Sequence, residues 1–85
     1  MTIGGVKSGV ANAANRAKQG LAELRAVRQS IDEAIARVRS ATQGTSRDEV
    51  DKAVTAWQSA QAELDQATAA IMTGVEQSET YAARI

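Results

Sequence analysis

Apolar residues recur every seven positions along two long segments of this sequence. We label the first two recurring positions a and d of a heptad. In the first segment, position a holds Val10, Ala17, Leu24, Ile31 and Val38, and position d holds Ala13, Gly20, Val27, Ala34 and Ala41. In the second, position a holds Val50, Trp57, Leu64, Ile71, Ser78 and Ile85, and position d holds Ala53, Ala60, Ala67, Gly74 and Tyr81. A sustained heptad pattern predicts two long helices with coiled-coil-like packing.

The pattern stops once, at residues 42–46, where the residues are typical of a helix end followed by a helix start. Gly44 suits the left-handed conformation that closes a helix. Ser46 and Glu49 have the spacing of a capping box. We therefore predict helix 1 at about 7–42, a turn at 43–46 and helix 2 at about 47–83, with residues 1–6 frayed. A turn this short makes the helices antiparallel neighbours, so residues 1–85 form one all-α hairpin domain.

Positions a and d are predicted to form the seam inside the hairpin, because large side chains on one helix then face small ones on the other. Folding at the turn sets Trp57 opposite Ala34 and Ile71 opposite Gly20. Small residues at position d are expected to bring the two backbones close together.

A second apolar stripe lies at position e, beside the predicted seam. Leu21, Ile35, Val54 and Val75 form it, Ala14 and Ala82 extend it, and Arg28, Gln61 and Thr68 interrupt it. A lone a/d hairpin would leave this stripe exposed. We therefore expect it to bind a second copy, giving a four-helix bundle, or another helical partner. The alternative is an elongated monomer with scattered surface apolar residues.

Composition narrows the chemistry. The chain contains no Cys and no His, which removes disulfides, thiol nucleophiles, imidazole bases and the usual zinc ligands. The acidic pairs Asp32/Glu33 and Glu63/Asp65 lie off the predicted seam and are interpreted as solvated helix faces. We expect no catalytic residue, cofactor or metal, and no small-molecule substrate.

The zero net charge conceals two oppositely charged halves. Residues 1–41 carry a net +4 and residues 42–85 a net −4, which indicates that the halves lie against each other. Nucleic-acid binding through Lys18, Arg25, Arg28 and Arg39 is the less favoured interpretation, because phosphate binding needs uncompensated basic residues. No segment has the length and hydropathy of a membrane span or signal peptide. The expected location is cytoplasmic, or outside the cell without a cleaved signal peptide.

The chain has two aromatic residues, both on the predicted seam. Trp57 is expected in the core. Tyr81 either closes the hairpin against Val10 or is displayed to a partner.

The size, the hairpin pattern, the lack of Cys and the Ala- and Arg-rich composition resemble small actinobacterial helical proteins, particularly the ESAT-6-like (WXG100) group. That group has Trp-x-Gly at the turn and a Tyr-x-x-x-Asp/Glu tail. Here the turn holds Gly44-Thr45, Trp57 lies within helix 2, and the tail from Tyr81 ends in Ile85. The resemblance implies a hairpin that pairs into homo- or heterodimeric four-helix bundles and is exported without a signal peptide.

These observations favour a non-catalytic protein–protein interaction module that self-associates or pairs with a helical partner. The alternative is a small accessory or regulatory protein of a biosynthetic or toxin operon that binds one larger partner.

Overall fold

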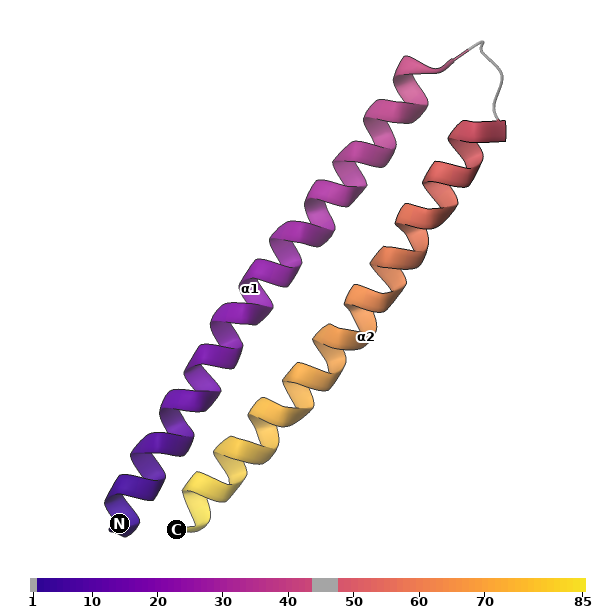
Figure 1. Cartoon of the computed structure of the whole chain (residues 1–85). Helices are drawn as coiled ribbons and strands as arrows, with labels where there is room; N and C mark the ends of the chain where they lie inside the picture. The colour runs from indigo at the N-terminus through magenta and orange to yellow at the C-terminus, as the bar shows by residue number, and fades with distance from the viewer. Residues whose placement is uncertain (1, 44–47) are drawn as a thin grey trace.

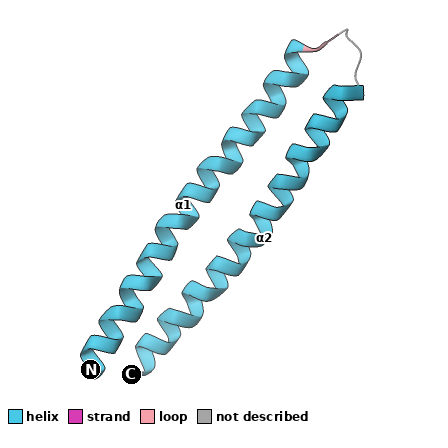
Figure 2. Ribbon diagram, viewed as in Figure 1, coloured by secondary structure: helices cyan, strands magenta, loops and turns pink. Residues whose placement is uncertain are grey.

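The protein is an antiparallel pair of long α-helices, seen here in a computed structural model that describes residues 2–43 and 48–85. Helix α1 spans Ile3–Ala41 and helix α2 spans Asp48–Arg84. The two helices run side by side for their whole length, so that both ends of the chain lie at the same end of the hairpin (Figure 1). The molecule measures 65 × 16 × 15 Å. The described residues contain helix and turn and no strand (Figure 2), which confirms the predicted all-α hairpin.

Helix α1 begins four residues earlier than the sequence predicted. Thr2 is its N-cap in an extended conformation, and the Thr2 hydroxyl accepts a hydrogen bond of 3.0 Å from the Gly5 amide. This bond satisfies an amide that would otherwise lack a partner in the first turn. The predicted start of the helix at about residue 7 was therefore too late, since it weighed the low helix propensity of Gly4 and Gly5 without the cap.

The other helix boundaries agree closely with the prediction. Helix α1 ends at Ala41, where the Thr42 amide donates to the Val38 carbonyl at 3.1 Å, and α2 ends at Arg84. Asp48, Glu49 and Asp51 occupy the first turn of α2, where negative charge offsets the positive end of the helix dipole. The predicted capping residues Gly44 and Ser46 lie outside the described residues.

The buried core of the hairpin lies at position e. Its six apolar members expose between 3% and 8% of their surface: Ala14, Leu21, Ile35, Val54, Val75 and Ala82. Position a lies beside this row and is half-buried on both helices, from Val10 to Val38 and from Val50 to Ser78. The hairpin seam is therefore formed by positions a and e.

This arrangement overturns the prediction that positions a and d form the seam and that the position e stripe binds a partner. Leu21, Ile35, Val54, Val75, Ala14 and Ala82 are the core of the hairpin itself, so no exposed stripe exists there. The physical reason is size. Position e carries Leu, Ile and Val where position d carries mainly Ala and Gly, and burying the larger side chains removes more apolar area from water.

Position d lies at the edge of the contact between the helices. Val27, Ala67, Gly74 and Tyr81 are exposed there, and Gly20, Ala34, Ala53 and Ala60 are half-buried. A Cβ atom added at Gly20 or Gly74 would meet nothing within 4 Å. The expected close backbone approach at these small residues is therefore wrong for the hairpin.

Candidate functional site

The two long faces of the hairpin differ in chemistry. On each helix, positions a and e face the other helix. Going around the helix from the seam, position d comes next to position a on one side, and position b comes next to position e on the other side. The d side carries the small and apolar residues described above. The b side carries mostly charged and polar residues, among them Lys18, Arg25, Asp32, Asp65 and Glu79. The hairpin therefore has one apolar face and one charged face.

On the charged face, side chains from the two helices pair with each other. Lys18 Nζ lies 2.9 Å from Glu79 Oε2. Arg28 donates to both carboxylate oxygens of Asp65, from Nε at 2.7 Å and from Nη2 at 3.3 Å. These pairs show the register of the two helices, with residue 18 beside residue 79 and residue 28 beside residue 65.

Arg28 belongs to a four-residue cluster that fills the polar interruption in the position e row. Besides Asp65, Arg28 contacts Asp32 through Nη1 at 3.2 Å, and Gln61 Nε2 donates to Asp32 Oδ1. Gln61 exposes only 9% of its surface. Arg28 and Gln61 thus reach carboxylates on the charged face from core positions, so that none of the four lacks a partner.

The Arg28–Asp65 contact also shifts the ionisation of both groups. The hydrogen bond from Arg28, reinforced by its positive charge, holds the pKa of the Asp65 carboxyl below its ordinary value. The same hydrogen bond raises the pKa of Arg28. Asp32 and Asp65 therefore help to join the two helices, where the sequence had suggested only solvated faces.

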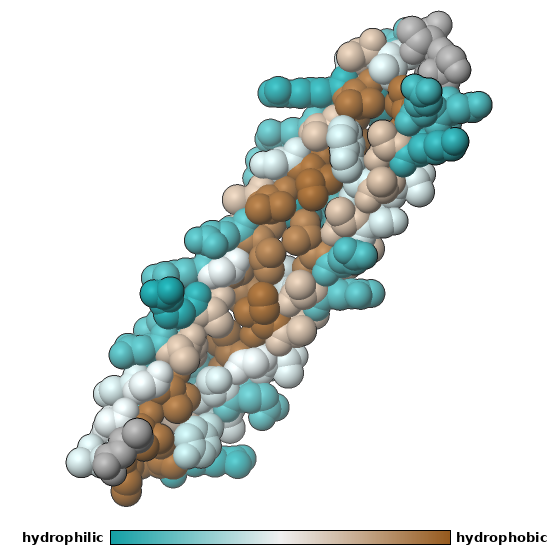
Figure 3. Space-filling view, in the orientation of Figure 1, coloured by the Kyte–Doolittle hydropathy of each residue, from teal (hydrophilic) through white to brown (hydrophobic). Residues whose placement is uncertain are grey.

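The apolar face carries the candidate binding site. Viewed from this side, brown hydrophobic side chains follow the line between the two helices along most of the hairpin (Figure 3). They come from position d and from the half-buried position a. Val27 exposes 47% and Tyr81 50% of its surface, and Trp57, Leu64 and Ile71 are each only partly covered. The apolar face, as we use the term, consists of positions a and d of both helices.

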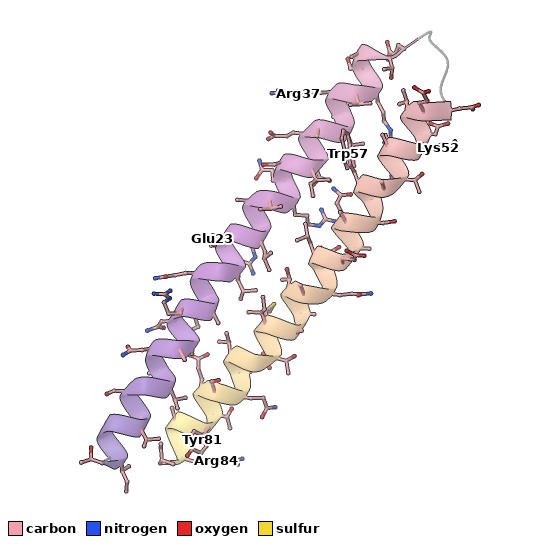
Figure 4. All side chains as sticks on the ribbon, viewed as in Figure 1. Glu23, Arg37, Lys52, Trp57, Tyr81 and Arg84 are labelled. Carbon is pink, nitrogen blue, oxygen red and sulfur yellow. The ribbon has the colours of Figure 1, made fainter. Side chains whose placement is uncertain are left out.

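Trp57 and Tyr81 both belong to this face, near opposite ends of α2 (Figure 4). Trp57 is half-buried at position a of the seam, so the expectation of a core tryptophan holds only in part. Tyr81 is exposed and does not close the seam. Sequence reasoning identified the apolar residues of this face but assigned them to the interior of the hairpin.

The outer edges of the apolar face are charged. Position g lies next to position d on the side away from the seam, and its charged residues are Arg16, Glu23 and Arg37 on α1 and Glu49, Glu63 and Arg84 on α2. Figure 4 shows Glu23 and Arg37 on the outer side of α1 and Arg84 on the outer side of α2. Among the described residues, no ion pair involves any of these six side chains.

Other kinds of site are not found in residues 2–43 and 48–85. The two helices enclose no pocket there, and no group of three or more acidic residues is arranged to hold a metal ion. Neither of the described helices combines the length and apolar character needed to cross a membrane. Two of the four basic residues considered for nucleic-acid binding, Lys18 and Arg28, are engaged in ion pairs.

Comparison with known proteins adds no relative: no family model, curated protein or solved structure matches the chain.

Proposed function

We propose that the protein is a non-catalytic interaction module whose apolar face binds the apolar surface of a helical partner. The observation that carries the proposal is the contrast between the two faces. On the charged face, ion pairs satisfy side chains of the two helices. On the opposite face, large apolar side chains stay partly in contact with water along the hairpin. Large exposed apolar patches with polar rims are typical of protein-binding surfaces.

The thinness of the core supports the same proposal. Among the described residues, no side chain exposes less than 2% of its surface, and the few buried apolar residues lie in a single row. Two helices alone cannot surround a core, and small domains with little buried surface often gain stability by association. A helix or hairpin laid on the apolar face would cover positions a and d and complete the packing.

The proposal takes one element from the resemblance to the ESAT-6-like group, namely a hairpin that functions by binding another helical protein. An accessory protein that binds one larger partner would use the same face. The Lys18 and Arg28 ion pairs leave nucleic-acid binding with less support, because those charges are already compensated.

The test is the size of the protein in an extract of the cells that make it. Fluorescently labelled chain, followed by sedimentation in that extract, should move as a species larger than the 8.9 kDa hairpin. Val27→Glu places a charge on the apolar face and should leave the chain sedimenting alone. Met72→Glu, at position b on the opposite face, is the matched control and should behave as the wild type. A wild-type chain that sediments alone, or a Val27→Glu chain that stays in the larger species, would refute the proposal.

A further inference from the structure

We propose that the partner on the apolar face is a second copy of this chain, docked face to face and antiparallel about a twofold axis that passes beside Gly20 and Gly74. The inference rests on the proposed function and adds the identity and arrangement of the partner. It follows from the exposed area, from the position of the two glycines and from the charges along the edges of the face.

The hairpin exposes more surface than is usual for a folded monomer of the same mass. The hairpin exposes 6239 Å², whereas a folded monomer of 8.9 kDa exposes about 4,800 Å² by the usual scaling of surface with mass. The excess of about 1,400 Å² is larger than the ~800 Å² that each partner contributes to a standard stable interface. One chain therefore offers enough surface for a stable dimer.

Gly20 and Gly74 lie at nearly the same height along the hairpin. The cross-helix pairs Lys18–Glu79 and Arg28–Asp65 bracket both glycines. Both occupy position d on the apolar face, and a Cβ at either would meet nothing within 4 Å. A second backbone can approach closest where side chains are smallest, so this height is suited to the centre of a face-to-face contact.

The edge charges are arranged symmetrically about these glycines. On α1, Arg16 lies four residues before Gly20 and Glu23 lies three residues after it. On α2, Glu63 lies eleven residues before Gly74 and Arg84 lies ten residues after it.

A twofold axis beside the glycines therefore sets Arg16 next to Glu23 of the second copy, and Glu63 next to Arg84 of the second copy. Each pair occurs twice, as in any interface between two identical surfaces. All four groups lack a partner in the described part of the single hairpin. Charge complementarity of this kind fixes the register of an interface.

Two other face-to-face arrangements match charges less well. Moving the twofold axis one heptad toward the turn places it beside Val27 on α1; it then sets Glu49 beside Arg84 but Arg16 beside Arg37, which have like charges. Like charges side by side oppose association.

With the two turns at the same end, α1 lies on α2 of the second copy. Arg16 is then level with Gln77 and Glu23 with Ala70, so neither charge finds an opposite partner. Of these three arrangements, only the one centred on the glycines pairs Arg16 with Glu23 and Glu63 with Arg84.

Single cysteines test the arrangement directly, because the chain has no Cys of its own. At the twofold axis the two copies of residue 20 come together, and a disulfide needs Cα atoms about 4.4–6.8 Å apart. Gly20→Cys and Gly74→Cys should therefore each form disulfide-linked dimers under mild oxidation at low micromolar concentration. The control Ala34→Cys, also at position d, should stay unlinked. Linking through Val27→Cys but not Gly20→Cys would place the axis one heptad nearer the turn and overturn the proposed register.

Sedimentation equilibrium of the purified chain tests whether the partner is a second copy. The wild type should approach twice 8.9 kDa as its concentration rises. Arg16→Glu should weaken the dimer about tenfold, because one reversal replaces two attractions by two repulsions. Adding Glu23→Arg in the same chain should restore the dissociation constant to about the wild-type value. Arg37→Glu should leave it unchanged, since Arg37 lies at the limit of the overlap.

A purified chain that stays monomeric at high micromolar concentration, while the same chain sediments as a larger species in extract, would overturn the second copy and leave the proposed function standing. Monomeric behaviour in both settings would refute both. A dimer that ignores the Arg16 and Glu23 reversals would contradict the pairing of the edge charges.

Discussion

Leu21→Ala tests whether position e is the core of the hairpin. Leu21 exposes 8% of its surface. The substitution removes three carbon atoms, at about 0.8 kcal/mol for each buried methylene, so the transfer cost is about 2 kcal/mol. A residual cavity would add to this cost, but a core one row deep can close around it. We therefore expect the free energy of unfolding to fall by about 2 kcal/mol, which lowers the Tm of a domain this size by about 10 °C.

The assay is thermal and urea unfolding followed by circular dichroism at the lowest practical concentration, since association would itself add stability. Met72→Ala is the matched control, because Met72 has a side chain of similar size but exposes 44% of its surface on the charged face. It should change the free energy of unfolding by less than about 0.5 kcal/mol. If Leu21→Ala is as mild as Met72→Ala, position e is not the core and the reasoning is wrong.

Three further outcomes are expected. Gly20→Ala should stabilise the monomeric hairpin by about 0.5–1 kcal/mol in urea unfolding, because the added methyl group meets no atom within 4 Å and Ala favours the helix; destabilisation would show that the site is closed. Asp65→Asn should lower the Tm at neutral pH. Since the folded pKa of Asp65 lies below its unfolded value, this stabilisation is complete above about pH 5 and is lost as the pH falls through the folded pKa; a gap between the wild-type and Asp65→Asn Tm values that stays constant down to pH 2 would contradict the ion pair. Thr2→Ala should speed amide hydrogen exchange in the first turns of α1 by about fivefold, matching the ~1 kcal/mol of an N-cap; unchanged exchange would mean that the cap does not hold the helix end.

The hairpin itself was predictable because heptad spacing determines which residues share a stripe. The same spacing allows two different seams. Positions a and d are separated alternately by three and four residues, and positions a and e alternately by four and three. The repeated Ala and Gly at position d favoured the first pairing, as did Arg28 and Gln61 at position e. The structure adopts the second, in which Leu21 and Val75 are buried.

What the sequence could not supply is the set of contacts that makes polar residues acceptable beside the core. Arg28 reaches Asp65 and Asp32, and Gln61 reaches Asp32. These contacts depend on the register of two helices, which is a property of the folded pair. Without these contacts, placing the charged Arg28 side chain in the row of core residues would be energetically unfavourable. The +4 and −4 halves gave one usable signal, because they indicated that basic residues of α1 pair with acidic residues of α2, as Lys18 and Glu79 do.

The central claim is that the hairpin buries position e and leaves position d open, and two neighbouring residues test it. In a chain without cysteine, Gly74→Cys and Val75→Cys each add one thiol at adjacent positions, one on the open apolar face and one in the core, where Val75 exposes 7% of its surface. The rate of alkylation of the folded monomer is the measurement. We predict that the thiol at residue 74 reacts at least about tenfold faster, because the thiol at residue 75 reacts only when the hairpin opens. Equal rates, or faster reaction at residue 75, would contradict the account.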